Sequence, residues 1–518
     1  MGSGRDKRKK QKGKQPGLGA SKTEKKTANN ATKELRRAEK TAAGGEDDLD
    51  ALLAQFQLSD KLQKEVQVLS EAPAPSPRVF ASFTPIPTQK DDILLFGGEY
   101  YDSKADKMRC YNDIFIYSPR KDRWTQVISP GGGRPAPRSS HQAAVHRGFL
   151  YMFGGELMSP NQQSFKHYQD LWRMDLERHT WELLPGKGGP QGRSGHRMAL
   201  HKNKLLTFGG FNDSGKACQY FNDLWEYDIE ELRWRSVPPG SAARPSPRGG
   251  SQVAVAGDTL FLYGGHSVEV DPADKSETET VHDDMWALDL LTYQWERVRR
   301  AGMAPSPRTS FGLATHRQRA VLFGGITDRA GAGDKLFSEM HNELYQFSFA
   351  SRRWFPLALR ARRGLQQADK AADKFLERGG FERGSALHRA AVRIQANYRG
   401  YAVRKAYTTY KLGGPVSELL YSPATYGIDF AARDAPRPRA RANPMLAVCG
   451  NTLWLLGGVV EVAHTDVTLD DLWCLDLAKL DGWRCVRANT AGEDAFRDDS
   501  SGWEEEGPEG QGEGSDSD

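Results

Sequence analysis

Apolar and polar positions along the chain follow a pattern that recurs six times. Each unit contains an apolar run that ends in two glycines, and these runs are ILLFGG (Gly97-Gly98), LYMFGG (Gly154-Gly155), LLTFGG (Gly209-Gly210), LFLYGG (Gly264-Gly265), AVLFGG (Gly324-Gly325) and LWLLGG (Gly457-Gly458). A variable loop and a segment of alternating apolar and polar residues follow each diglycine: NDIFIY, QDLWRMD, NDLWEYD, DDMWALD, NELYQF and DDLWCLD. Short apolar runs and period-two alternation both predict β-strands.

Two further residues keep a constant place in every unit. A Trp follows the alternating segment, at Trp124, Trp181, Trp234, Trp295, Trp354 and Trp483. An Arg opens another strand upstream of the diglycine, at Arg78, Arg138, Arg193, Arg248, Arg308 and Arg441. Four short strands per unit of roughly 50 residues predict an all-β fold, a β-propeller in which each unit is one blade. A solenoid or two β-sandwiches would not explain six-fold spacing with this internal order.

The local chemistry of each unit agrees with a propeller blade. Gly reaches a positive φ angle without steric cost, so a strand that ends in Gly-Gly can turn sharply. The late Trp can fill the wedge between neighbouring sheets. The Asp or Asn before the third strand is typical of a turn, where its side chain bonds to the nearby backbone.

The spacing of the diglycines predicts the number of blades. Their intervals are 57, 55, 55, 60 and 133 residues, so the last interval holds about 76 extra residues. Gly379-Gly380 and Gly413-Gly414 lie in it, but no strand-like run precedes either pair, and no Trp lies between Trp354 and Trp454. We therefore expect six blades with an insertion between the fifth and the sixth. The expected parts are a basic head (1–45), a helix and linker (46–77), repeats 1–5 (78–356), the insertion (357–435), repeat 6 (436–492) and an acidic disordered tail (493–518).

Diglycines, tryptophans and arginines in this register resemble those of the kelch-repeat family of β-propellers. Within that family, the chain looks most similar to the kelch domain-containing protein 4 group. This resemblance rests on a lysine-rich head, the segment DDLDALLAQF (Asp47 to Phe56), an acidic tail and two specific stretches, Phe96 to Val127 and Thr468 to Val486. It covers roughly residues 46–356 and 436–518.

The insertion contains a motif of a different kind. Five of its residues fit I-Q-x-x-x-R-G-x-x-x-R, the IQ motif that binds calmodulin or its relatives: Ile394, Gln395, Arg399, Gly400 and Arg404. On a helix at about residues 385–411, Ile394, Tyr398 and Tyr401 would share one face among basic residues, which suits an acidic, groove-forming partner. The alternatives are a solvated helix that packs on the propeller and a linker with a chance match. The kelch group named above does not carry this element, so the chain departs from it here.

The resemblance gives the six recurring arginines two alternative roles. In kelch folds this position lies near the mouth of the central channel, where some family members use Arg to hold acidic peptides, and Arg binds carboxylates in bidentate geometry. The resulting ligand-face candidates are Arg78, Arg138, Arg193, Arg248, Arg308 and Arg441. Alternatively, each Arg braces the neighbouring blade by bonding to backbone carbonyls or to a carboxylate.

Charge is concentrated outside the repeats. The net charge is +5, but residues 1–40 carry 14 Lys and Arg against 4 Asp and Glu, whereas residues 493–518 carry 11 acidic residues against one Arg. The basic run Arg5 to Lys14 is a nuclear localisation signal, an RNA contact or a solvating arm. No aromatic residue occurs in residues 1–50, so sequence-specific nucleic-acid binding is not expected.

An amphipathic helix is predicted around residues 46–70 by the apolar positions Leu49, Leu52, Leu53, Phe56, Leu62, Val66 and Leu69. We expect it to pack against the propeller. The five cysteines lack C-x-x-C spacing, and no apolar run approaches the roughly 18 residues of a membrane span. With no signal peptide visible, the expected location is cytoplasmic, and a nuclear location stays open.

Motifs of catalysis do not occur in the sequence. His141 and His196 occupy the same repeat position and are interpreted as structural, and no His pair has metal-ligand spacing. We therefore expect a non-catalytic protein-binding scaffold without cofactor or metal, with a protein partner on the propeller face and calmodulin-type regulation through the insertion. One alternative is a ubiquitin-ligase substrate receptor, although residues 1–77 are too short and polar for a BTB domain. The other is a copper enzyme of the galactose oxidase type, which is similar in fold.

Overall fold

The apolar run before each diglycine forms the most deeply buried strand of its unit. In the computed structural model, the four side chains of β3 (Ile93–Phe96) have no solvent exposure. Such a strand is continuously apolar because neighbouring sheets cover both of its faces. The structure describes residues 49–63, 65–87, 91–131, 133–214, 217–238, 240, 243–270, 277–330, 336–359, 436–462, 465–492 and 496.

Six antiparallel sheets form the blades, and each has four strands hydrogen-bonded in chain order, with the ribbon strands described below set apart. From blade 1 to blade 6, the first strands are β2 (Ser82–Pro85), β8 (Gln142–His146), β14 (Arg197–His201), β20 (Gln252–Ala256), β26 (Gly312–His316) and β32 (Met445–Cys449). The second strands are β3 (Ile93–Phe96), β9 (Phe149–Phe153), β15 (Lys204–Phe208), β21 (Thr259–Tyr263), β27 (Arg319–Phe323) and β33 (Thr452–Val462).

The two outer strands of each blade carry the alternating segment and the late Trp. The third strands are β6 (Ile114–Ser118), β12 (Leu171–Asp175), β18 (Leu224–Asp228), β24 (Met285–Asp289), β30 (Leu344–Ser348) and β34 (Thr465–Asp476). The fourth strands are β7 (Arg123–Ile128), β13 (Thr180–Leu184), β19 (Arg233–Val237), β25 (Trp295–Val298), β31 (Arg353–Pro356) and β35 (Arg484–Arg487).

Hairpin ribbons extend from each blade between its second and third strands. In blades 1 to 5 they are separate two-stranded sheets: β4 (Glu99–Asp102) with β5 (Lys107–Cys110), β10 (Glu156–Met158) with β11 (Phe165–His167), β16 (Phe211–Asp213) with β17 (Cys218–Tyr220), β22 (His266–Val270) with β23 (Glu277–Val281), and β28 (Ile326–Ala330) with β29 (Leu336–Met340). In blade 6 the hairpin is continuous with β33 and β34. The ribbons of blades 1 to 4 contact one another in order, so they share one face of the propeller.

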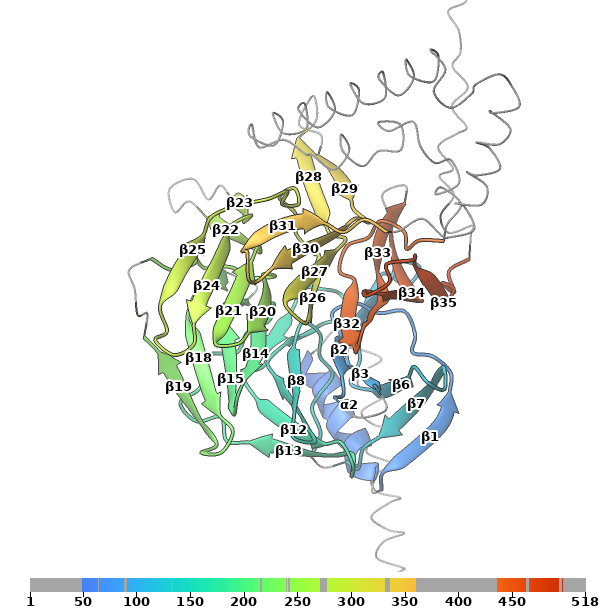
Figure 1. Cartoon of the computed structure of the whole chain (residues 1–518). Helices are drawn as coiled ribbons and strands as arrows, with labels where there is room; N and C mark the ends of the chain where they lie inside the picture. The colour runs from blue at the N-terminus through green and yellow to red at the C-terminus, as the bar shows by residue number, and fades with distance from the viewer. Residues whose placement is uncertain are drawn as a thin grey trace, which may run out of the picture.

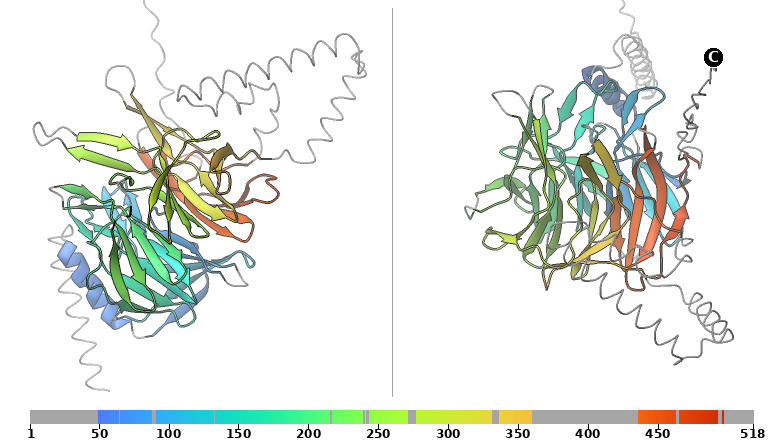
Figure 2. Two further views of the ribbon diagram at one scale, coloured as in Figure 1. Left: turned by 60° about the vertical axis from the view of Figure 1, so that its left-hand side comes forward. Right: turned by 90° about the horizontal axis from the view of Figure 1, so that it is seen from above.

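The blades close into a ring around a central axis. The first strands of neighbouring blades lie side by side, and β2 contacts both β8 and β32, which joins blade 1 to blade 6 (Figure 1). Across this closure the rings of Tyr117 and Trp454 lie 5.2 Å apart. Two further views show the blades following one another around the axis (Figure 2). The prediction of six blades is confirmed, and residues 357–444 separate β31 from β32 along the chain.

The late Trp of each unit fills the space between neighbouring blades, as predicted. Trp234 on β19 is 7% exposed, and its ring lies 5.0 Å from the ring of Phe153 in blade 2. The partner is the aromatic residue immediately before the diglycine of the preceding blade. The same pair recurs as Trp181–Phe96, Trp295–Phe208, Trp354–Tyr263 and Trp483–Phe323.

The segment before the first blade differs from the predicted helix. Helix α2 spans Leu49–Leu62, and β1 (Gln67–Ala72) then pairs antiparallel with β7 as a fifth strand of blade 1. The prediction of a helix through residue 70 is therefore wrong after Leu62. The physical reason is that the outer edge of β7 presents unpaired backbone groups that this segment can bond.

The shorter helix packs against the propeller, as expected. Asp60 near its end forms an ion pair with Arg134. Leu53 lines a pocket of about 400 Å³ together with Met108 and Leu157 of the first two ribbons. The expected head, the insertion from residue 360 to 435 and the tail residues other than Phe496 lie outside the described residues. Within the described part, no helix is long and apolar enough to cross a membrane.

Candidate functional site

The six recurring arginines are buried inside the blades. None exceeds 3% exposure, and each guanidinium forms an ion pair with the acidic residue that precedes the third strand of its own blade. The pairs are Arg78–Asp113, Arg138–Asp170, Arg193–Asp223, Arg248–Asp284, Arg308–Glu343 and Arg441–Asp471. The acidic residue thus does more than the turn role that its sequence position suggests.

The ion pair in blade 2 shows the geometry of these Arg–carboxylate pairs, which are called braces below. Arg138 donates to both carboxylate oxygens of Asp170, at 2.7 and 2.9 Å, and to the carbonyl of Gly154 at 3.0 Å. Trp172 donates its indole N–H to the same carboxylate at 2.7 Å. Burial alone would raise the pKa of Asp170, but the charge and hydrogen bonds of Arg138 hold it below the ordinary value. The guanidinium therefore joins the first, second and third strands of one blade.

The backbone of the same Arg joins one blade to the preceding blade. In blades 1, 2, 3 and 5, the second glycine of the diglycine donates its N–H to the Arg carbonyl of the next blade, as Gly98 does to Arg138 at 3.0 Å. A side chain on Gly97 would place its Cβ only 2.7 Å from that carbonyl oxygen, and Gly97 has a φ of +66°. Only Gly satisfies both conditions, which explains the invariant pair of glycines in the six units.

Each of the six guanidinium groups bonds within its own blade and not to the neighbouring blade, which differs from the bracing alternative drawn from the sequence. Their donors are directed to carboxylates and glycine carbonyls inside the blades, and none of the six lines the central cavity. The side chains that face the axis come instead from the residues two and four positions after each Arg.

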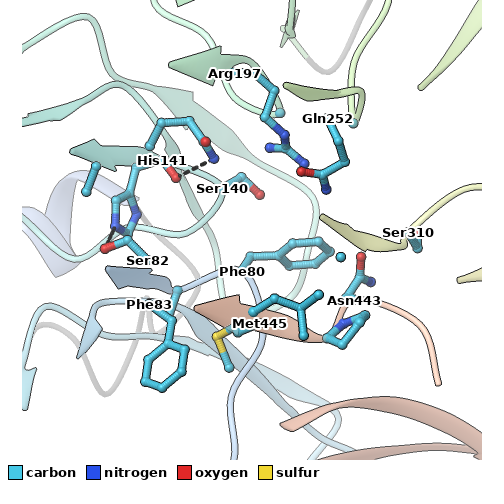
Figure 3. Close-up of a pocket in the computed structure, with 18 of the residues that line it drawn as sticks. Phe80, Ser82, Phe83, Ser140, His141, Arg197, Gln252, Ser310, Asn443 and Met445 are labelled. Carbon is cyan, nitrogen blue, oxygen red and sulfur yellow. Dashed lines mark hydrogen bonds between the residues drawn. The ribbon is translucent and has the colours of Figure 1, made fainter. Parts of the chain in front are cut away.

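A cavity of about 490 Å³ lies on the propeller axis and is lined by all six blades. The residues four positions after each Arg begin the first strands and line it: Ser82, Gln142, Arg197, Gln252, Gly312 and Met445. Figure 3 shows Arg197 and Gln252 entering this cavity from one side and Phe80, Asn443 and Met445 from another. The volume falls in the range of about 300–1,000 Å³ that is usual for ligand pockets.

The residues two positions after each Arg form the mouth of the cavity, and all six have a left-handed backbone. They are Phe80, Ser140, Gly195, Gly250, Ser310 and Asn443, with φ angles between +51° and +64°. Their backbones are linked around the axis by hydrogen bonds, for example from Ser140 N–H to the Phe80 carbonyl at 3.0 Å and from Gly250 N–H to the Gly195 carbonyl at 2.9 Å. This mouth ring requires the left-handed conformation at every blade.

Arg197 brings an unpaired positive charge into the cavity. One guanidinium N–H donates to the carbonyl of His196 at 3.1 Å, and the Nε atom is buried without a hydrogen-bond partner. Burial lowers the pKa of Arg197 to about 10, and in the described part of the chain no acidic group offsets this. A partly desolvated guanidinium without an anion is unfavourable.

Two acidic side chains in the wall have raised pKa values. Glu99 and Glu156 follow the diglycines of blades 1 and 2, line the cavity and are 6% and 8% exposed. Hydroxyls of the next blade donate to them, from Ser139 to Glu99 at 2.6 Å and from Ser194 to Glu156 at 3.2 Å. Burial raises the pKa of both, to about 7 for Glu156, where the charge of Glu99 contributes as well.

His141 and His196 are buried beside the cavity and are neutral. Their rings lie edge-on to Phe96 and Phe153, at 5.3 and 5.2 Å. Burial lowers the pKa of His141 to about 3 and that of His196 well below its ordinary value. Among the residues that the structure describes, no three His, Cys, Asp or Glu side chains are grouped as a metal site requires.

Sequence reasoning missed Arg197, although a signal for it exists. When the six units are aligned on their recurring Arg, the residue four positions later is Ser, Gln, Arg, Gln, Gly and Met, so a single cation stands among uncharged residues. The predicted IQ residues Ile394, Gln395, Arg399, Gly400 and Arg404 lie outside the described residues.

A closed six-bladed ring of this kind, with Arg–carboxylate braces, cross-blade Trp pairs and a ligand-sized axial cavity, defines a repeat propeller of the kelch type. Comparison with protein families agrees, because the model described as the KLHDC2/KLHL20/DRC7 Kelch-repeats domain matches residues 43–210 and 167–368. These matches together span more than half of the chain, so the chain belongs to the kelch-repeat family. The IQ calmodulin-binding motif is also matched, at residues 388–408.

The relatives match only part of this chain. Kelch domain-containing protein 3 from Homo sapiens is 25% identical over 271 residues, which are 50% of this chain and 65% of the relative. Acyl-CoA-binding domain-containing protein 4 from Arabidopsis thaliana is 27% identical over 44% of this chain and 32% of its own length. An N-(sulfonatooxy)prop-2-enimidothioate sulfolyase from Thlaspi arvense is 27% identical over 40% of this chain and 75% of its own length. The chain thus spans less than two thirds of the first two.

Proposed function

We propose that this protein is an interaction scaffold whose axial cavity binds a peptide segment of a partner protein through a carboxylate group. The observation that carries the proposal is Arg197, a partly buried guanidinium that lines a ligand-sized cavity without an acidic partner in the described part of the chain. A carboxylate in the cavity would neutralise the charge of this guanidinium and could accept its N–H groups in bidentate geometry.

The walls of the cavity suit a peptide in an extended conformation. Polar side chains such as Ser140, Gln142 and Gln252 line the cavity together with larger apolar ones such as Phe80 and Phe311. Glu156 has a pKa of about 7, so below that pH it adds little negative charge to repel an acidic ligand. We therefore expect acidic peptides to bind more tightly at pH 6 than at pH 8.

Fluorescence polarisation on the full chain tests this proposal. The probes are labelled hexapeptides that carry one Asp side chain with an amidated end, or one free terminal carboxylate, or neither. Arg197→Met should weaken binding of the acidic probes roughly 10- to 100-fold, the effect of about 1.5–3 kcal/mol for a hydrogen bond to a charged group. The control is Arg233→Met, which removes an exposed Arg on the outer strand of the same blade. Equal affinity for acidic and neutral probes would overturn the proposal.

We propose in addition that calmodulin or a related EF-hand protein binds the inserted IQ segment. The family match at residues 388–408 supports this role. A labelled peptide of residues 385–411 is titrated with calmodulin in calcium and then in chelator, and we expect binding that persists without calcium. Ile394→Ala with Arg399→Ala should abolish it, whereas Thr409→Ala, beyond the motif, should not. Lack of saturable binding under both conditions would contradict the proposal.

We propose a non-catalytic role for the propeller, although one relative is named as a sulfolyase. The axial cavity supports this proposal, because burial lowers the pKa of both histidines that line it, His141 and His266, and His141 is occupied by a hydrogen bond with Ser82. Copper analysis of the purified full chain tests the oxidase alternative. A stoichiometric metal content would argue against a simple scaffold.

A further inference from the structure

Phe80 occupies a backbone conformation that is unfavourable for its residue type. Its φ angle is +55°, in the left-handed region, where bulky side chains are rare. The other five positions of the mouth ring carry Gly, Ser or Asn, which adopt this conformation more readily. The hydrogen bond from Ser140 N–H to the Phe80 carbonyl holds the backbone in place, so the strain at residue 80 is imposed by the ring.

Burial does not compensate this strain. Phe80 is 39% exposed, whereas Phe96 and Phe153 of the neighbouring core have no exposure. Figure 3 shows its ring extending into the axial cavity, beside Asn443 and Met445. A strained conformation that is kept without a packing gain is typical of a functional position.

The position of Phe80 divides the cavity into two unlike walls. Blades 5, 6 and 1 are consecutive around the closed ring, and they contribute Phe311, Met445 and Phe80. In a six-membered ring, blade 4 lies opposite blade 1 and blade 3 opposite blade 6, so Gln252 and Arg197 face this apolar wall. A ligand that satisfies both walls needs a charged group and an apolar group close together.

We infer that Phe80 is a specificity-determining residue that binds a bulky apolar side chain next to the carboxylate of the ligand. This inference rests on the proposed function, because Arg197 fixes the position of the carboxylate. The ligand class is therefore an extended peptide in which a Leu- or Phe-like residue adjoins an acidic group. Neutral or basic segments lack the partner for Arg197, and acidic segments with only small side chains leave Phe80 exposed to water.

The test compares labelled hexapeptides that differ only in the residue next to a single Asp, which is Leu, Ala or Ser on either side. With the unmodified full chain, the best Leu probe should bind about tenfold more tightly than the Ser probe, as expected for partial burial of a Leu side chain. Phe80→Ala should remove this difference and leave the Ser probe unchanged. The matched control is Phe355→Ala, because Phe355 is 38% exposed but lies on the outer strand β31.

A stability measurement shows whether the aromatic side chain of Phe80 serves binding or serves the stability of the fold. Phe80→Gly relieves the positive φ angle, so its thermal midpoint should rise while its Leu-probe affinity falls. A lower thermal midpoint would show that the aromatic side chain of Phe80 stabilises the fold and would overturn the inference. If acidic probes bind through Arg197 but Phe80→Ala affects the Leu, Ala and Ser probes alike, this inference is wrong and the proposed function stands. If no acidic probe binds the unmodified chain, both fail.

Discussion

Removal of the acidic residue from a brace should destabilise the propeller in proportion to the burial of that residue. Asp471 in blade 6 is the most buried example, since its side chain is 8% exposed and its partner Arg441 is inaccessible. Asp471→Ala leaves the guanidinium with only the carbonyls of Gly457 and Arg439 as acceptors, and Trp473 loses its acceptor as well. A buried charge without its partner costs about 3–5 kcal/mol.

The same substitution in blade 3 should cost less. The side chain of Asp223 is 37% exposed, although its partner Arg193 is 1% exposed. Water can reach the space that the carboxylate leaves and can solvate part of the guanidinium. We therefore expect about 1.5–3 kcal/mol for Asp223→Ala, the range for a single hydrogen bond to a charged group.

Urea unfolding of the full chain, followed by Trp fluorescence, measures both losses from the shift in midpoint. The control is Asp476→Ala, on the same strand as Asp471, because Asp476 caps a turn through the N–H groups of Ala478 and Lys479 and its ion pair is with the exposed side chain of Lys479. Its expected cost is about 1 kcal/mol. A loss for Asp471→Ala that is no larger than the control, or smaller than that for Asp223→Ala, would refute the argument that burial sets the cost.

Three further outcomes follow from the fold and the cavity. Trp234→Ala should cost about 3–5 kcal/mol in the same unfolding assay, because its ring is 7% exposed between two blades, and a loss below about 1 kcal/mol would contradict the repeat register. Replacement of residues 360–435 by a short flexible linker should leave cooperative unfolding, and its loss would mean that a blade has been removed. Glu156 has its pKa raised to about 7, mainly by burial, so the folded state holds its proton longer than the unfolded state. Its contribution to stability therefore falls by about 3 kcal/mol as the pH rises from 4.5 through 7, and Glu156→Gln should flatten the pH profile of the urea midpoint in that window.

The repeat architecture could be predicted from sequence because its determinants are local. A buried strand, a diglycine turn and a late Trp each follow from residues within one unit, and their spacing gives the blade count. The pairing of each Arg with the acidic residue of its blade could not be predicted from local sequence. Arg138 and Asp170 are separated by 32 positions, and the Asp has an adequate local explanation as a turn residue. Only the fold shows that the two meet.

The prediction of where the first helix ends was wrong for a related reason. Val66 and Leu69 continue the apolar spacing of α2, but the edge of β7 lies where residues 67–72 can bond to it, and tertiary pairing overrides a weak helical pattern. The apolar periodicity of a segment gives no information about an unpaired strand edge that lies elsewhere in the sequence. Arg197 is the opposite case, because its signal is present in the sequence but appears only after the six units are superimposed on their common Arg.

The contrast between constant and variable positions separates structure from recognition in this propeller. The Arg and the glycines recur because every blade must meet its neighbours with the same geometry. A residue that this geometry requires cannot vary between blades, so it cannot determine ligand specificity. The residues two and four positions after the Arg line the cavity, and the bonds that link the mouth ring from blade to blade are made by backbone atoms, so the side chains can differ without loss of the ring. Phe80 and Arg197 are the bulkiest departures at these two positions, one apolar and one charged, and they come from blades separated by only one other. The cavity-lining positions that differ between blades should therefore determine which ligands the propeller binds. Replacing Phe80 by Ser and Arg197 by Gln, the residues found at these positions in blade 2, should remove the binding preference while all six Arg–carboxylate pairs remain.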